Sequence, residues 1–303
     1  MSAVMPSLAV ARYTLVELTR RRILLVFVIV GAVGIALLGI LLKIAANAIG
    51  TNVIVASPSA SQVDPAKVQQ VLELGFVNDL IGVLSFFAFL IAFAIGMTAI
   101  YHDLESGAAV SIFSKPVSRL GFTAGKIGAA VLAMIVIVGL LSLEARLVMQ
   151  LFGGGLDQAL WGEAAASVAN AVALMLLVLA LSTWMNNIVA AVVAFIYNAV
   201  ASFIVTLHQQ LDAGNLGDNP AVKGVVNVVY WLVPHALRSD AQREITRRTL
   251  EIFTTAEARR GQSMDQILAG IPGASSVSDI LWWVFVVAFF AALVYIAVRR
   301  RQV

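Results

Sequence analysis

Apolar residues gather into six runs that are long enough to cross a membrane, with polar segments between them. A helix needs about 20 consecutive apolar residues to span the hydrocarbon core of a bilayer. A seventh run, Ala221–Val233, is too short and contains Lys223 and Asn227, so we expect an interfacial or re-entrant helix there. The pattern predicts an all-α integral membrane protein with six transmembrane helices. The six runs are Ile23–Leu42, Leu80–Ile100, Ile127–Val148, Ala164–Met185, Ile188–Leu207 and Ile280–Val298.

The composition agrees with a membrane protein. Of the 303 residues, 60% are hydrophobic and only 12% are charged. Soluble domains carry about 25% charged residues, so this much apolar surface exceeds what soluble packing absorbs. Cysteine is absent, which excludes a disulfide framework, a thiolate metal site and a cysteine nucleophile.

Lysine and arginine residues predict the orientation in the membrane. An even number of spans puts both termini on one side, and basic residues in short loops favour the cytoplasmic side. The two shorter loops on the opposite side hold only Lys43 and Lys67, with Arg146 near the edge. We therefore expect cytoplasmic termini and a cytoplasmic loop at Tyr101–Lys126. The basic residues on that side are Arg12, Arg20, Arg21, Arg22, Lys115, Arg119, Lys126, Arg299, Arg300 and Arg301.

The chain before the first span predicts a cytoplasmic interfacial helix over residues 1–22. Leu8, Leu15 and Leu18 share one helical face, which is typical of an amphipathic helix on a membrane surface. The alternative is a basic anchor that only orients the first span. In either case the arginines that lie at the lipid headgroups are Arg12, Arg20, Arg21 and Arg22.

The rest of the chain divides into three further parts. Residues 23–207 hold the first five spans, with a short external helix expected over Pro65–Leu74 after Asp64 as its N-cap. Residues 208–279 predict an external helical segment, in which Ser239-Asp240 starts one helix and Ser263–Gln266 forms a capping box. Residues 280–303 hold the sixth span and a basic cytoplasmic tail.

No catalytic, cofactor or metal motif is present. Gly121–Lys126 ends in Gly-Lys, but its first glycine is one position too close for a P-loop, and Ile127 replaces the required Ser or Thr. His102, His208 and His235 fall on both sides of the predicted membrane, which argues against one metal site. We expect no catalytic residue, metal or cofactor in this chain, and no nucleic-acid partner.

Ionisable residues inside spans usually mark transport pathways, because they are costly in lipid. Here the exceptions are Glu144 and Arg146 in the third span, which we expect to reach the headgroups by snorkelling; the alternative is that Glu144 lines a cavity. Possible pathway residues are Glu144 and Asn198. The energy for transport is expected to come from another polypeptide. Polar side chains expected to form interhelical hydrogen bonds are Asn170, Ser182, Asn198 and Ser202.

The cytoplasmic loop has a pattern of its own. Gly107 interrupts the chain after the second span, Ala108–Phe113 predicts a short helix, and Pro116 disfavours helix at Lys115. Gly121 and Gly125 form a small-xxx-small pair, which we interpret as loop flexibility rather than a dimer seam. The bare pattern fits either a short helix at the mouth of two spans or a plain connecting loop.

The motif Glu105-x-Gly107, followed by Lys115-Pro116-Val117-Ser118-Arg119, Phe122 and Gly125-Lys126, resembles the second cytoplasmic segment of ABC-2-type transporter permeases. The subgroup is the one associated with multi-copper enzyme maturation and nitrous-oxide-reductase assembly. Ala11–Arg22 resembles its interfacial helix, and Trp231–Pro234 resembles its aromatic-x-x-Pro element. Two departures are Ala108, where the family has Thr, and the long segment before the sixth span.

The resemblance implies a function for the whole chain: the permease subunit of an ATP-driven exporter in the bacterial cytoplasmic (inner) membrane. It implies a dimer with a second permease copy, contact with membrane lipid, and a cytosolic ABC ATPase partner that holds ATP and Mg. An alternative is a non-transporting scaffold whose external segment recruits or matures an extracytoplasmic protein, and an intramembrane enzyme has no motif in its favour. The implied ATPase-coupling residues are Asp103, Glu105, Gly107, Ile112, Phe113, Lys115, Pro116, Arg119 and Lys126.

Overall fold

The computed structural model describes residues 4–20, 22–52, 65–100, 117–150, 157–212, 219–233, 235–253, 268, 271 and 273–300. Across these residues the regular elements are all α-helices. Six of them are long and apolar enough to cross a membrane, which confirms the six-span, all-α fold class. They are α2 (Arg22–Asn52), α3 (Pro65–Thr98), α6 (Arg119–Gln150), α7 (Asp157–Trp184), α8 (Asn187–Asp212) and α12 (Val277–Arg300).

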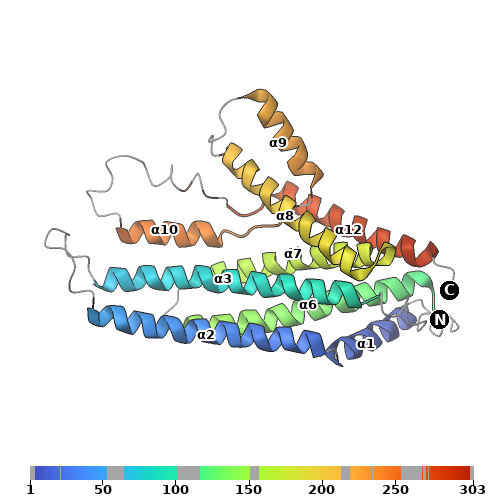
Figure 1. The fold of residues 1–303 in the computed structure, drawn as a ribbon, viewed down its shortest axis with the longest axis horizontal. Helices are drawn as coiled ribbons and strands as arrows, with labels where there is room; N and C mark the ends of the chain where they lie inside the picture. Colours follow the sequence, from blue (N-terminus) through green and yellow to red (C-terminus); the bar gives the residue numbers. More distant parts are fainter. Residues whose placement is uncertain are drawn as a thin grey trace.

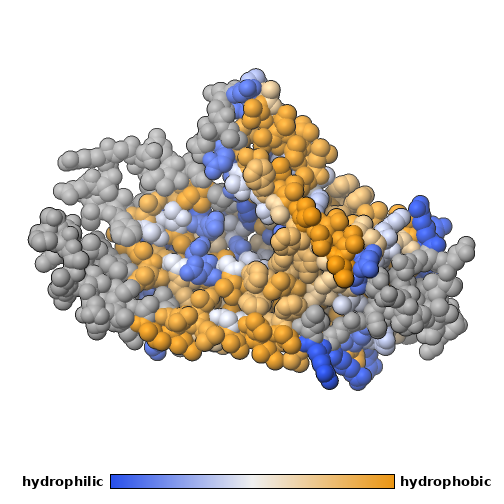
Figure 2. Space-filling model, viewed as in Figure 1, coloured by the Kyte–Doolittle hydropathy of each residue, from blue (hydrophilic) through white to orange (hydrophobic). Residues whose placement is uncertain are grey.

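The long helices lie side by side along the longest axis of the molecule (Figure 1). Both chain ends lie at the same end of this bundle, together with the starts of α2 and α6 and the end of α12. We call this the basic end, because Arg20, Arg22, Arg119, Arg299 and Arg300 lie there, and the opposite one the far end. Hydrophilic surface also gathers at the basic end in the space-filling view (Figure 2). The cytoplasmic location of this end stays a prediction.

Helices α3 and α7 form the centre of the bundle. Each is buried over more than half of its span, whereas α8 is buried over less than a fifth. Leu80, Leu84 and Ile91 of α3 and Met175 and Leu179 of α7 are fully enclosed. The exposed side chains of α2 and α8 are mostly large and apolar, as a surface facing lipid requires.

Helix α3 begins at Pro65 and runs without a break into the second span, so the separate helix expected over Pro65–Leu74 does not exist. Proline suits the first helical position, which explains why the helix begins there. No helix-breaking residue other than Gly75 follows before the span, and glycine alone does not end a helix held by tertiary contacts. At 34 residues α3 is roughly 50 Å long, so it projects beyond an apolar core of about 30 Å.

The N-terminal helix α1 (Val4–Arg20) was expected to lie on the membrane surface with Leu8, Leu15 and Leu18 on its apolar face. Leu18 is buried and Leu15 packs against the core, but Leu8 is exposed, so the expected face is only partly right. The buried stripe is Val10, Thr14 and Leu18, spaced by four residues, and it packs against α6. Helix α1 is therefore part of the bundle.

Gly121 and Gly125 at the start of α6 allow α1 to pack closely against this helix. A Cβ atom at Gly125 would lie 2.7 Å from the main-chain oxygen of Ser7 and 3.1 Å from the Cβ of Val10. Gly121 and Gly125 are thus helical residues at a crossing with α1, and the interpretation as loop flexibility is wrong. Small residues let two helix backbones approach closely, which is what the motif achieves within one chain here.

The segment after α8 returns to the bundle through two short helices. Helix α9 (Pro220–Leu232) begins after Asn219, whose side chain accepts a hydrogen bond from the amide of Ala221. It packs on α8, and the two lean away from the bundle together (Figure 1). Residues 235–239, here called the strap, then lead to α10 (Ala241–Phe253), which lies along α3 at the far end. The capping box at Ser263–Gln266 lies outside the described residues.

The predicted start of α10 is confirmed. The Ser239 hydroxyl accepts a hydrogen bond from the amide of Ala241, and Ile245 is buried against the bundle. On its outer side, hydrogen bonds from Arg247 and then Arg248 lower the pKa of Glu244 to about 2. Mixed charge of this kind keeps the outer face in water.

A prediction concerns the α3–α7 contact. A Cβ at Gly96 would lie 2.8 Å from the Cβ of Val178 and 2.9 Å from the main-chain oxygen of Met175, neither of which can rotate away. Gly96→Ala should therefore destabilise the protein by about 1–3 kcal/mol in detergent, measured by thermal unfolding.

Gly82→Ala on the same helix is the matched control, because a Cβ there meets nothing within 4 Å. It should leave the unfolding temperature unchanged or slightly higher, since alanine favours helix. Equal effects of the two substitutions would contradict the close crossing.

Candidate functional site

The loop predicted over Tyr101–Lys126 is shorter than expected, because α6 begins at Arg119. The Ser118 hydroxyl accepts a hydrogen bond from the amide of Gly121, and the Ser118 carbonyl accepts one from Phe122. Ser118 thus acts as an N-cap, a signal that was readable from the sequence. The coupling residues that lie outside the described residues are Asp103, Glu105, Gly107, Ile112, Phe113, Lys115 and Pro116.

Arg119 joins the start of α6 to the end of α12. One guanidinium nitrogen donates hydrogen bonds to the main-chain oxygens of Arg299, at 2.6 Å, and Val298, at 3.2 Å. The last carbonyls of a helix lack partners within the helix, and its C-terminus carries partial negative charge. A cation in this place satisfies both needs, so the first residue of α6 is fixed to the sixth span.

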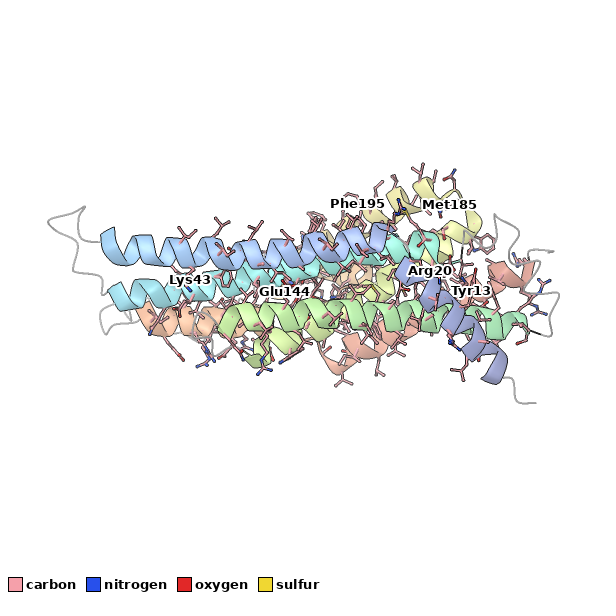
Figure 3. All side chains as sticks on the ribbon, turned by 90° about the horizontal axis from the view of Figure 1, so that it is seen from below. Tyr13, Arg20, Lys43, Glu144, Met185 and Phe195 are labelled. Atoms are coloured by element: carbon pink, nitrogen blue, oxygen red, sulfur yellow. The ribbon has the colours of Figure 1, made fainter. Side chains whose placement is uncertain are left out.

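Lys126 joins the same part of α6 to α1. Its side chain is completely buried, its Nζ lies 3.1 Å from Glu17 Oε2, and it lies 5.5 Å from the ring centroid of Tyr13. Lys126 is therefore enclosed between α6 and α1 and is not an exposed residue of a loop. Figure 3 shows α1, with Tyr13 and Arg20, crossing the bundle at this end. The ion pair holds the N-terminal helix against the base of the third span.

The position of the predicted interfacial arginines at lipid headgroups stays a prediction. Arg12, Arg20 and Arg22 are exposed at the basic end, and Arg21 lies outside the described residues. The guanidinium of Arg300 lies 5.8 Å from the ring centroid of Trp184, at the turn between α7 and α8. The basic end thus carries exposed arginines around two contacts, the capping of α12 by Arg119 and the buried pair of Lys126 and Glu17.

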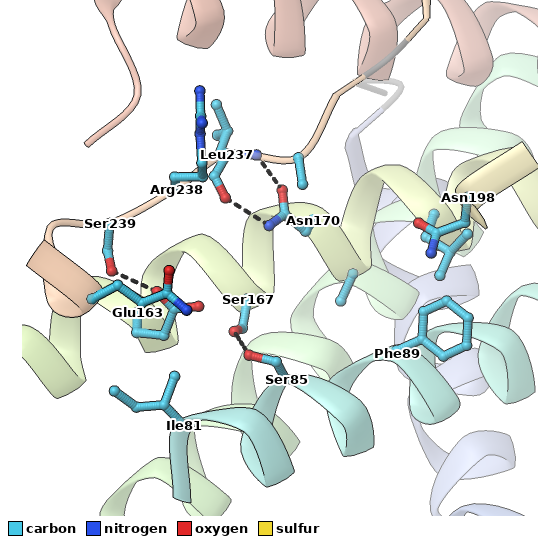
Figure 4. A pocket seen from close by; sticks show the side chains of 14 residues that line it. Ile81, Ser85, Phe89, Glu163, Ser167, Asn170, Asn198, Leu237, Arg238 and Ser239 are labelled. Carbon is cyan, nitrogen blue, oxygen red and sulfur yellow. Dashed lines mark hydrogen bonds between the residues drawn. The ribbon is translucent and has the colours of Figure 1, made fainter. Parts of the chain in front are cut away.

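A cavity of about 330 Å³ lies between α3, α7 and the strap (Figure 4). The hydroxyls of Ser85 and Ser167 are hydrogen-bonded across it at 2.8 Å. Asn170 accepts a hydrogen bond from the amide of Leu237 and donates one to its carbonyl, at 2.7 and 2.9 Å. These bonds hold the strap over the cavity.

A second cavity of about 180 Å³ lies next to the first and shares Asn170, Leu174 and Asn198 with it. Asn198, a possible pathway residue, therefore lines both cavities. Glu144 lines neither of them. Four aromatic residues, Tyr197, Trp282, Trp283 and Phe290, line part of the second cavity.

The polar residues expected to link helices behave differently from one another. Ser182 and Ser202 donate to main-chain oxygens of their own helices, those of Leu179 and Asn198, so an interhelical role is wrong for these two bonds. Serine commonly bonds back to the preceding turn in this way. Asn170 does bridge segments, but to the strap instead of another span.

An aromatic and acidic cluster ties α9 to α12 beside these cavities. The Tyr230 ring stacks on both His208 and His235, with 4.0 Å between centroids in each case. Asp279 accepts hydrogen bonds from the Tyr230 hydroxyl, from His235 Nε2 at 3.1 Å and from the amide of Ser276. Burial, and then the charge of Asp279, raise the pKa of Tyr230 far above its ordinary value.

His208 and His235 share one site in this cluster, and His102 lies outside the described residues. The residues involved are far apart in sequence, and only the fold brings them together. Among the described residues, no group of three or more His, Cys, Asp or Glu could hold a metal ion.

These observations define the class of the protein: a multi-pass helical membrane protein with a clamped basic end and a cavity beneath the strap. A scan against models of known protein families finds no match, and a search of curated proteins finds no significant relative.

A prediction tests the buried pair. Lys126→Met removes the buried cation that pairs with Glu17 and should destabilise the protein by about 3 kcal/mol, measured by unfolding in detergent. The double variant Glu17→Gln/Lys126→Met should recover most of this loss, because both charges are then absent.

Lys43→Met is the control, since Lys43 is exposed at the other end of α2. Its effect should stay within about 0.5 kcal/mol. If Lys126→Met is no worse than this control, the ion pair does not hold α1 in place.

A further prediction tests the cluster at Asp279. Asp279→Ala removes the acceptor for Tyr230, His235 and Ser276 and should cost about 1–3 kcal/mol of unfolding free energy. Asp240→Ala, which removes an exposed acceptor for the amide of Ala274, should cost less. Equal losses would show that the buried cluster adds no particular stability.

Proposed function

We propose that this chain is the permease subunit of an ATP-driven ABC-2-type exporter, coupled to a separate cytosolic ATPase through residues 101–126. The observation that carries the proposal is the double clamp at the start of α6. Arg119 is fixed to α12 and Lys126 to α1, and both residues belong to the motif that resembles the coupling loop of that family. The six spans and the basic end agree with the layout of such a permease.

The clamp offers a route by which a partner could move the bundle. A force applied to residues 101–116 reaches Arg119 first, and through its hydrogen bonds it reaches the end of α12. Two turns further along α6, Lys126 transmits the force to α1 through its ion pair with Glu17. Three helices would therefore move with the segment.

ATP and Mg belong to the partner in this proposal. Closure of the ATPase would favour one arrangement of the permease over another, because its contacts differ between the two arrangements. A second permease copy completes the transporter, and the cavities at the far end belong to the arrangement described here.

The test is co-purification with an ATPase subunit encoded beside this chain. The two proteins should form a detergent-stable complex, and Glu105→Arg should weaken it about tenfold or more by charge repulsion. Lys43→Glu, at the far end of α2, is the control and should leave the complex intact.

Retention of the complex by Glu105→Arg would remove the docking role of the segment. Absence of any ATPase complex would remove the exporter proposal. Recovery of an extracytoplasmic protein bound through the far end would then favour the scaffold, for which α10 offers a capped helix with a charged outer face.

A further inference from the structure

We infer that the cavity of about 330 Å³ beneath the strap binds an ammonium group attached to a hydrophobic body. The nitrogen would lie at Glu163 and the body would extend toward Phe89. The binding itself is independent of the exporter proposal, whereas a role for this ligand as cargo rests on it.

Two helical stripes give the cavity its shape. From α3 come Ile81, Ser85 and Phe89, spaced by four residues, so they share one face of that helix. The α7 stripe runs from Glu163 through Ser167 to Leu174. At about 1.5 Å of rise per residue, the α7 stripe covers roughly 16 Å along the helix.

The charged group lies at one side of this length and the aromatic ring at the other. The carboxylate of Glu163 lies toward the far end, the hydroxyl pair of Ser85 and Ser167 follows, and Phe89 and Leu174 come last. In Figure 4, Glu163 and Ser239 lie at one side of the cavity, and Phe89 and Asn198 at the other. A ligand that matches this arrangement has a polar head and an apolar body.

The charge at the polar side selects a cation. Glu163 and Arg238 are the charged residues of the described wall. The Arg238 side chain rises from the strap away from the hydroxyl pair (Figure 4), and it acts electrostatically on Tyr230 in the neighbouring cluster. The carboxylate of Glu163 is therefore the charge that a ligand in the cavity meets.

The remaining polar groups favour a ligand that donates hydrogen bonds. The Glu163 carboxylate accepts one bond from the Ser239 hydroxyl, at 2.5 Å, and keeps further acceptor sites. The side-chain oxygen and nitrogen of Asn170 are both hydrogen-bonded to Leu237. Asn170 therefore shapes the wall, and neighbouring residues contact the ligand. Charge-assisted bonds from an ammonium to a carboxylate are among the strong ones.

The volume fits a small molecule. Ligand sites commonly measure about 300–1,000 Å³ and combine an apolar wall with a few placed polar groups. A compact aromatic amine such as 2-phenylethylamine offers an ammonium group and one ring, which match the two sides of the cavity.

The experiment is equilibrium dialysis of labelled 2-phenylethylamine against the full chain in dodecylmaltoside micelles, with empty micelles subtracted. The uncharged 2-phenylethanol and the anionic 3-phenylpropanoate are the matched ligands. The amine should bind about tenfold more tightly than the alcohol, and the anion should not bind measurably. Equal affinity for amine and alcohol would overturn the assignment.

Glu163→Gln keeps a side chain that can accept from Ser239 but removes the charge, and it should weaken amine binding about tenfold. Glu144→Gln is the control, because Glu144 lies in a span and lines neither cavity. Unchanged amine affinity in Glu163→Gln, with a wild-type gel-filtration profile, would overturn the site. If Glu163→Gln does not fold, the comparison of amine, alcohol and anion binding to the wild-type chain tests the site.

Cargo status is tested separately by ATPase activity of the complex. Stimulation by the amine that is lost in Glu163→Gln would support cargo. Binding without stimulation would remove cargo status and leave the binding site, and an absent ATPase complex would remove the exporter proposal alone.

Discussion

The burial of Lys126 is the constraint on which the basic end depends. A lysine with no exposed surface is stable only when its charge is compensated, and here Glu17 and the Tyr13 ring supply that compensation from α1. The close approach at Gly125 allows the two helices to meet at this distance. The N-terminal helix is therefore a structural member of the bundle, and Arg119 extends the same connection to the last span.

The far end uses polar contacts for another purpose. There the strap is held over a cavity by the main-chain bonds of Leu237 to Asn170, and α9 is held to α12 through Tyr230, His235 and Asp279. These bonds fix the non-helical backbone of the strap beside α3 and α7. Such backbone is tolerated there because its polar groups are hydrogen-bonded. Contacts between α1, α6 and α12 thus hold one end of the bundle, and the cavity beneath the strap lies toward the other.

Much of the fold followed from local pattern. Apolar runs located all six spans, and serine before a helical period located the start of α10. Local pattern does not show the tertiary partner of a residue. Lys126 reads as a surface cation until α1 packs on it, and His208 and His235 are separated by a helix before Tyr230 brings them together. Asn198, a possible pathway residue from the sequence, lines both cavities. The sequence did not point to the carboxylate of Glu163.

The central claim is that the start of α6 moves as one body with α1. The cysteine-free chain allows spin labels at single engineered cysteines. Labels at the exposed positions Val16 on α1 and Leu120 on α6 would report their separation by pulsed electron spin resonance, in the ATPase complex with and without ATP. The account predicts an unchanged separation for this pair, while a second pair at Leu120 and Val193 of α8 changes. A change between Val16 and Leu120 would contradict it.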